Sequence, residues 1–214
     1  MLYCSALFAR YANKIKTAIF ASLLVAILIR TPDVFPSFEN KYFLEPMTFA
    51  EIIKAKESAI QFYAQDLLKA GCCATEAEAF EAAREEIYQE SSFKNYFFTI
   101  RSSAVEKPLG YVWCDRSNGE ESDEELLSDA YVQTIFLEQE FRGKGIAEKI
   151  MRNLEKQFKK AGASSIGLFV FAHNESAYHL YEKLGYKIMK IVVHPDMVVI
   201  GFRMKKELST EVLS

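Results

Sequence analysis

The chain has 214 residues, of which 50% are apolar, and its 26 basic and 29 acidic residues leave a net charge of −3. This length suits one domain with a proper core and is too short for two comfortable ones. The nearly balanced charge argues against nucleic-acid binding through a broad basic face. The four cysteines, Cys4, Cys72, Cys73 and Cys114, match no zinc-binding spacing, so we expect reduced thiols in a cytoplasmic protein and no metal.

Residues 1–40 differ from the rest of the chain. Basic residues precede an apolar run over 17–29, as in the charged and apolar regions of a signal peptide. A helix over this run would span only about 20 Å, less than a bilayer core of about 30 Å. Three interpretations stay open: a dispensable extension or helix packed on the domain, a membrane-surface anchor, and a cleaved export signal. Pro32 and Pro36 mark a linker, and we place the domain at 41–214.

The first part of the domain is predicted to be one strand followed by two helices. The strand covers 42–47. Thr48 and Glu51 have the spacing of a capping box, which starts a helix that extends to about Ala70. The same spacing recurs at 75–78 and starts a second helix that extends to about residue 90.

A hairpin with strands over 95–101 and 110–114 is expected next. The linker over 115–129 carries seven acids and one arginine. It is either a solvated acidic loop or a negative rim that attracts a cationic amine.

The stretch over 132–147 is predicted to be a strand, a tight glycine turn and the start of a helix. Ile146, Ile150, Leu154 and Phe158 recur with helical spacing. Free N–H groups at the start of a helix suit a phosphate, and glycines let it approach the backbone. The turn lacks the P-loop pattern, and Glu148 replaces the third glycine of the dinucleotide fingerprint. An ordinary strand-to-helix turn is the alternative.

A second stretch has the same organisation. Residues 165–174 are predicted to be a strand, and 175–186 a short helix ended by Gly185. A closing hairpin is expected with strands over 187–193 and 197–205. The predicted order of elements is therefore βααβββαβαββ, a mixed α/β sheet.

These two stretches carry a family resemblance. Arg142-x-x-Gly145-x-Ala147, followed by Asn174-x-x-Ala177-x-x-x-Tyr181-Glu-Lys-x-Gly185-Tyr186, resembles the acetyl-CoA motifs of the GNAT N-acetyltransferase superfamily. The resemblance covers roughly 42–204 and is strongest to small bacterial members. It implies a mixed α/β fold with a largely antiparallel sheet flanked by helices. It also implies transfer of an acetyl group from acetyl-CoA to a primary amine, directly within a ternary complex.

The resemblance assigns roles to particular residues. Backbone groups near Phe136 and Leu137 would run along the pantetheine arm, and the N–H of Leu137 is a candidate for stabilising the oxyanion. The pyrophosphate would lie at the turn, and Arg142 would order that turn or pair charge. The equivalent of Tyr181 is commonly the general acid near the sulfur. The expected cofactor-binding residues are Phe136, Leu137, Arg142, Gly143, Lys144, Gly145, Ile146, Ala147, Asn174 and Ala177.

Two of these residues have alternative roles, and one catalytic role has no assigned residue. Asn174 is also a suitable helix N-cap, and Tyr181 is also a suitable core tyrosine. No general base is assigned, because the strand before Asn174 has no acid. Glu138, Glu140, Asp129, His173 and a water chain are the candidates.

Two other function classes stay open. One is a coenzyme-A-binding regulatory module without catalysis. The other is a membrane-tethered acyltransferase held by residues 17–29. The acceptor amine is not identified, and a cationic amine is expected only if the acidic linker is a negative rim. The oligomeric state stays open, with a homodimer among the options.

Overall fold

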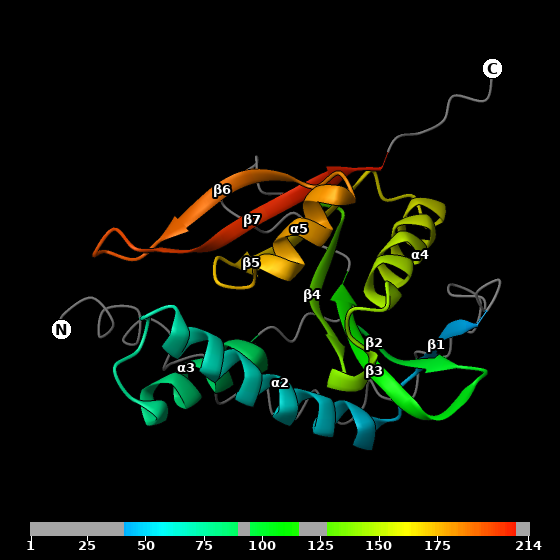
Figure 1. The fold of residues 1–214 in the computed structure, drawn as a ribbon, viewed down its shortest axis with the longest axis horizontal. Coiled ribbons are helices and arrows are strands. Elements are labelled where there is room, and N and C mark those ends of the chain that lie inside the picture. Colours follow the sequence, from blue (N-terminus) through cyan, green and yellow to red (C-terminus); the bar gives the residue numbers. More distant parts are fainter. Residues whose placement is uncertain (1–40, 90–94, 116–127, 209–214) are drawn as a thin grey trace, which may run out of the picture. The chain divides into compact units, whose positions relative to one another are not determined.

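The structure is a computed structural model that describes residues 41–89, 95–115 and 128–208 (Figure 1). Its elements follow the predicted order, βααβββαβαββ. Residues 1–40 and most of the predicted acidic linker, 116–127, lie outside these ranges. None of the helices in the described part is long and apolar enough to cross a membrane.

The capping boxes explain where the first two helices begin. Strand β1 (Tyr42–Pro46) leads to α2 (Phe49–Lys69). Thr48 caps α2, because its hydroxyl accepts from the Glu51 N–H while the Glu51 carboxylate accepts from the Thr48 N–H. Helix α3 (Glu76–Gln89) begins with half of this arrangement, because the Glu78 carboxylate accepts instead from the Ala74 N–H.

The strands form one seven-stranded sheet in the order β1-β2-β3-β4-β5-β7-β6. All neighbouring strands are antiparallel except β4 and β5, which confirms the predicted mixed, largely antiparallel sheet. The remaining strands are β2 (Asn95–Ser102), β3 (Val105–Asp115), β4 (Ala130–Leu137), β5 (Ser165–Phe171), β6 (Lys187–Val193) and β7 (Val199–Glu207).

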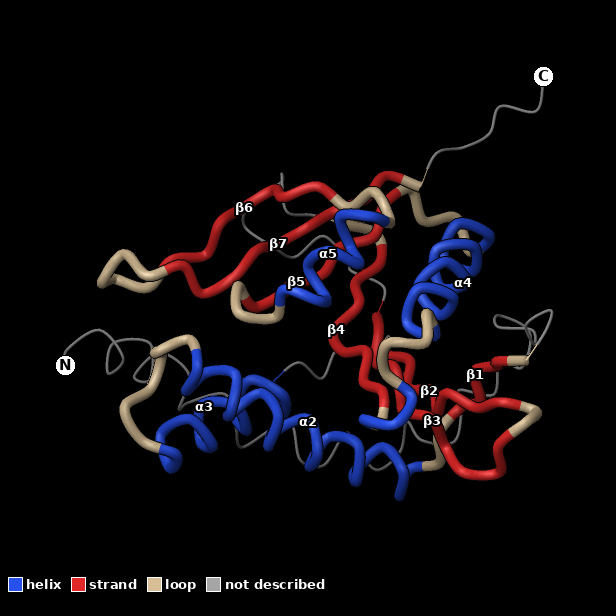
Figure 2. Tube along the Cα trace, viewed as in Figure 1, coloured by secondary structure: helices blue, strands red, loops and turns tan. Residues whose placement is uncertain are grey.

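Helices cover both faces of the sheet (Figure 2). The apolar stripe of α4 (Ile146–Lys160) packs on one face together with α5 (Glu175–Lys183). Ile150, Leu154 and Phe158 of that stripe are fully buried. On the opposite face, α2 and α3 enclose a second core around Trp113. Full burial of one such side chain is worth about 1.5–3 kcal/mol, so each helix pair is held firmly to its face.

Strands β3 and β7 begin at other residues than the sequence predicts. Strand β3 begins at Val105 rather than at Gly110, and the hairpin turn lies at 103–104. Val105 is followed by Glu106, Lys107 and Pro108, which are all exposed. These residue types are uncommon in strands, so the sequence did not predict one here. Strand β7 begins at Val199 because Met197 has a positive φ of 66° and belongs to the preceding turn.

Candidate active site

A gap opens in the middle of the sheet between β4 and β5. The two strands pair only over Ala130–Val132, opposite Ile166–Leu168. Beyond these residues β4 continues along β3 as far as Leu137, and β5 continues along β7 as far as Phe171. No other strand of the described ranges fills the space between their facing edges. The gap therefore presents backbone groups that a ligand can pair with as an added strand would.

A β-bulge lies where the gap begins. Trp113 pairs with Thr134, whereas Cys114 pairs with Val132, so Gln133 is the extra residue in β4. A bulge bends its strand and increases the local twist. Because Val132 is the last β4 residue that pairs with β5, the bend at Gln133 explains why the two strands diverge.

The register of β4 shows which amides face the gap. The Glu138 N–H donates to the Leu109 carbonyl at 2.9 Å. Gly110 and Leu137 are therefore a non-hydrogen-bonded pair, and the backbone groups of Leu137 point away from β3. The N–H groups alternate along the strand, so Ile135 faces the same gap. Either amide is positioned to donate to a ligand carbonyl.

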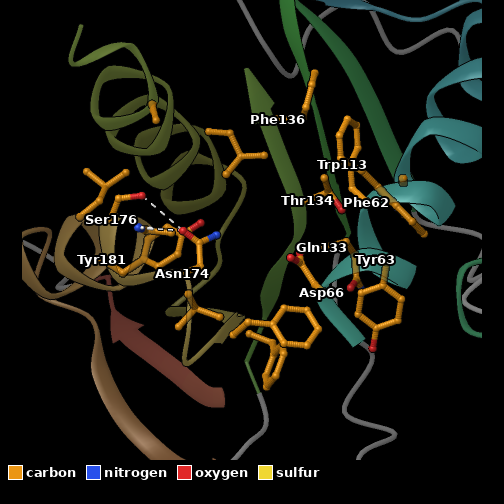
Figure 3. A pocket seen from close by; sticks show the side chains of 18 of the residues that line it. Phe62, Tyr63, Asp66, Trp113, Gln133, Thr134, Phe136, Asn174, Ser176 and Tyr181 are labelled. Atoms are coloured by element: carbon orange, nitrogen blue, oxygen red, sulfur yellow. Dashed lines mark hydrogen bonds between the residues drawn. The ribbon is translucent and has the colours of Figure 1, made fainter. Parts of the chain in front are cut away.

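A cleft of about 1500 Å³ includes this gap and extends to both faces of the sheet. Figure 3 shows Asn174 and Tyr181 on one side of the cleft and the aromatic residues Phe62 and Tyr63 of α2 on the other, with β4 between them. A ligand that occupies the gap is therefore in contact with side chains from both layers of helices.

The glycine turn closes one end of the cleft. Gly143 and Gly145 both have φ near 71°, a left-handed conformation that other residues adopt at a cost. Gly145 is the N-cap of α4, so the first N–H groups of the helix open toward the cleft. Arg142 orders the turn by donating from Nε to the Leu137 carbonyl at 2.8 Å. The resulting group of amides can bind a phosphate at the positive end of the helix dipole.

The structure brings most of the predicted cofactor-binding residues together. Phe136, Leu137, Arg142, Gly143, Gly145, Ile146, Ala147, Asn174 and Ala177 all line the cleft. Lys144 is not among the residues that line it, and its ammonium lies 5.7 Å from the centre of the Phe141 ring. Lys144 was expected among the cofactor-binding residues, but the direction of its side chain depends on the conformation of the turn.

Glu148 lines the cleft beside the glycine turn, where a negative charge would repel a phosphate. Its carboxylate accepts from Lys183 Nζ at 2.7 Å and from Arg152 Nη2 at 3.0 Å. These hydrogen bonds, with Lys183 the larger cause, lower the pKa of Glu148 below its usual value. The carboxylate is therefore neutralised by two cations and ties the start of α4 to the end of α5.

Asn174 caps α5, as the sequence suggested. Its side-chain oxygen accepts from the Ala177 N–H at 3.3 Å, and Ser176 Oγ donates to the same oxygen at 3.3 Å. Asn174 is nevertheless exposed on its other side and lines the cleft. The cap uses only the side-chain oxygen of Asn174, so its amide nitrogen is available to bind a ligand.

Tyr181 is one turn further along α5 than Ala177, and its side chain is 6% exposed at the cleft wall. Burial raises the pKa of its phenol to about 12. The hydroxyl is therefore protonated throughout the neutral range, as a group that donates a proton must be.

Aromatic rings dominate the cleft on the side of α2 and α3. The Phe136 ring stacks between Phe62, at 4.7 Å, and Tyr111, at 5.2 Å. Tyr63 of α2 packs near Phe171 of β5 at 5.6 Å and donates from its hydroxyl to Glu86 at 2.7 Å. This wall is apolar and carries acidic groups at its margin, a combination that suits an amine with a hydrocarbon body.

The acidic residues are distributed differently from the sequence prediction. Glu138, Glu140 and Asp129, which flank β4, are not among the residues that line the cleft. Asp115, the last residue of β3, does line it and is 8% exposed. Sequence reasoning treated Asp115 as the first residue of an acidic linker. Its position at the end of an apolar strand, before the acidic segment begins, was the one available signal.

The family model described as the acetyltransferase (GNAT) family matches residues 64–186. The chain belongs to this family. It is 32% identical over 154 residues to the uncharacterized N-acetyltransferase YdgE of Bacillus subtilis, a match that covers 69% of this chain and 93% of YdgE. The chain is thus a GNAT-type N-acetyltransferase.

Solved structures show the same fold. The structure of YycN from Bacillus subtilis has a TM-score of 0.62 and 23% identity, and the match covers 72% of this chain and 96% of YycN. A spermidine N-acetyltransferase from Vibrio cholerae, solved with CoA and spermine, has a TM-score of 0.50 and 17% identity over 78% of this chain and 95% of that one. At these identities the likeness extends to the GNAT fold alone.

Proposed function

We propose that this GNAT enzyme transfers the acetyl group of acetyl-CoA directly to a primary amine while both substrates are bound. The observation that carries the proposal is the gap between β4 and β5, with the glycine turn at one end and Tyr181 in its wall. A linear ligand with an anionic end and amide groups along its length fits this arrangement. Coenzyme A has both features.

The phosphate end of acetyl-CoA would bind at the start of α4. Gly143 and Gly145 leave room, since a Cβ built at either position would meet nothing within 4 Å. The amides of Ile146 and Ala147 and the helix dipole supply the attraction. Arg142 holds the turn in shape through Leu137, and the Vibrio cholerae relative that binds CoA has the same fold.

The pantetheine arm would then lie along the open edge of β4. Its amides can pair with the backbone of Leu137 and Ile135, which face the gap. In this direction the thioester would lie near the bulge at Gln133, between the two layers of helices. The amide of Ile135 is then the nearer donor for the oxyanion, and the amide of Leu137 lies closer to the phosphate turn.

The acceptor would enter from the side of α2 and α3. The rings of Phe62, Tyr111 and Phe136 form its apolar wall, and Asp66 and Glu86 lie in the same part of the cleft. Carboxylates beside aromatic faces favour a cation. We therefore expect a primary amine with a hydrocarbon or aromatic body.

Tyr181 would complete the transfer as general acid. When the amine attacks the carbonyl carbon, a C–N bond forms, and the C–S bond then breaks. The Tyr181 phenol would protonate the departing thiolate, and its pKa of about 12 keeps that proton available at neutral pH. A proton donor beside the expected position of the sulfur supports a catalyst rather than a module that only binds coenzyme A.

Release of free thiol from acetyl-CoA, measured with a panel of amines, tests the function. We expect acetyl-CoA to be consumed only when an amine is present, with equal amounts of acetylated amine and free CoA. Aliphatic and aromatic primary amines should be better acceptors than alcohols or amino acids with a free carboxylate. Binding of acetyl-CoA without turnover on any amine would contradict the proposal.

A further inference from the structure

Asp115 is a buried carboxylate on the floor of the acceptor side of the cleft. Tyr111, Trp113 and Asp115 alternate along β3, so their side chains lie on the face that α2 and α3 cover. Asp115 Oδ2 accepts from Gln133 Nε2 at 2.9 Å. The carboxylate is thus held by the bulge residue at which β4 leaves β5.

The other acids that flank β4 do not line the cleft. Glu140 is exposed and pairs with Lys107 at 2.5 Å. Asp129 Oδ2 accepts from the Ser164 N–H at 2.6 Å in the connection before β5. Glu138 is exposed beyond the end of β4. None of the three is a cleft-lining residue, so Asp115 is the acid of the described part that lies closest to the bulge within the cleft.

Asp115 and Tyr181 approach the gap from opposite faces of the sheet. Asp115 is on the face covered by α2 and α3, whereas Tyr181 belongs to α5 on the other face. The attacking nitrogen and the departing sulfur occupy different corners of the tetrahedral intermediate. A proton acceptor on one face and a proton donor on the other match those two positions.

The surroundings favour a basic carboxylate. Burial raises the pKa of Asp115 above that of an ordinary aspartate, and the Gln133 hydrogen bond opposes part of this rise. A carboxylate with a raised pKa holds an abstracted proton more strongly. The ionisable groups that share the cleft with Asp115 are Tyr63, Asp66, Lys69, Cys72, Glu86, Tyr111, Tyr131, Arg142, Glu148, His173, Tyr181, Lys190 and Arg203.

We propose that Asp115 is the general base that deprotonates the acceptor amine, and that Gln133 positions it. This inference rests on the acetyl transfer proposed above. The ammonium gives one proton to Asp115, directly or through one water, and Asp115 releases it to solvent. The neutral amine forms the C–N bond. As the amide forms, the nitrogen loses a second proton, which replaces the proton that Tyr181 gives to sulfur. The whole reaction therefore releases one proton, the one that Asp115 passes to solvent.

Asp115→Asn tests the base, because asparagine keeps the size and a hydrogen bond to Gln133 but accepts no proton. We expect kcat to fall by about 10²- to 10⁴-fold, with the KM for the amine within about threefold of wild type. Calorimetric affinity for acetyl-CoA should be unchanged and also reports that the variant is folded. Asp196→Asn is the matched control, because Asp196 is an exposed aspartate in the turn between β6 and β7, and it should keep kcat within about twofold.

The pH profile distinguishes a base from a structural carboxylate. Wild-type kcat/KM should fall as the pH drops through the pKa of Asp115, because the protonated acid accepts no proton. Asp115→Asn should lose this limb. Gln133→Met removes the hydrogen bond that lowers the pKa of Asp115, so the limb should move to higher pH.

Three results would overturn the proposal while wild-type turnover stands. The first is a folded Asp115→Asn protein with kcat near wild type. The second is an Asp115→Asn protein in which only the KM for the amine changes. The third is a Gln133→Met protein whose pH profile keeps its acidic limb at the wild-type position. The last result decides the question even if Asp115→Asn does not fold. Absence of wild-type turnover on every amine would instead remove the proposed function itself.

Discussion

The imidazole Nε2 of His173 lies 2.9 Å from Oδ1 of Asp66, although the two residues are 107 positions apart in the chain. This contact ties the segment before α5 to α2 across the cleft, and His173 also stacks on Phe171 at 5.3 Å. One contact therefore connects the expected cofactor side of the cleft with the expected acceptor side.

His173→Phe should weaken acceptor binding modestly. Phenylalanine keeps the stacking on Phe171 but loses the bond to Asp66. Partly exposed pairs are worth roughly 0.2–1 kcal/mol, so steady-state kinetics should show the KM for the amine rising by up to about fivefold. His179→Phe is the matched control, because His179 pairs with Glu182 on the exposed face of α5. A fall in acetyl-CoA affinity instead would place the contact on the cofactor side.

Gly145→Glu should weaken acetyl-CoA binding by at least about 10-fold, or about 1.4 kcal/mol. The variant places a side chain and a negative charge at the expected pyrophosphate position. Gly162→Glu is the control, because Gly162 also has a positive φ, 87°, but lies beyond the other end of α4. Calorimetric titration of both proteins separates charge at the site from backbone strain. Equal affinities in the two folded variants would refute the assigned phosphate site.

Tyr181→Phe should lower kcat by about 10²- to 10⁴-fold and leave the KM for acetyl-CoA almost unchanged. The substitution removes the proton donor and keeps the ring, which packs 5.8 Å from the ring of Tyr186. Tyr186→Phe is the control, since Tyr186 is equally buried but is not a cleft residue. If the hydroxyl is only structural, its loss should lower the free energy of unfolding by roughly 1 kcal/mol and leave kcat near wild type. Kinetics and melting curves are therefore measured on the same protein.

A truncated protein that begins at Lys41 should fold and keep acetyltransferase activity. Both capping motifs, the glycine turn and α5 lie beyond that residue, and β1 begins at Tyr42. The comparison of solubility, melting temperature and turnover with the full chain measures what residues 1–40 contribute. If the truncated protein is insoluble or inactive while the full chain works, those residues belong to the domain.

Local signals made the elements predictable. The Thr48–Glu51 capping box, the spacing of Ile150 and Leu154, and the glycine turn each depend on residues within a few positions of one another. The family motifs likewise placed Asn174 and Tyr181 in one cleft, where the structure has them. Sequence patterns of this kind describe a segment independently of its partners.

The remaining features depend on which segments are neighbours. The gap follows from the offset in pairing at Gln133, which is a property of β3 and β4 together. The position of Asp115 in the cleft requires the layer of α2 and α3 above it, and an acidic residue at the end of a strand does not indicate that layer. The ammonium of Lys144 lies over the ring of Phe141, outside the cleft. The glycines of a turn do not determine where the other side chains of that turn point.

The gap between β4 and β5 also has a consequence for stability. Strands β4 and β5 make no ladder hydrogen bonds with each other at Ile135 and Leu137, in the centre of the sheet. A bound pantetheine arm would supply hydrogen bonds at these residues. A ligand that binds only the folded state stabilises it by about 2.7 kcal/mol when present at 100 times its Kd. The supply of acetyl-CoA would then set how much of the enzyme survives heat or proteolysis, in addition to how fast it turns over.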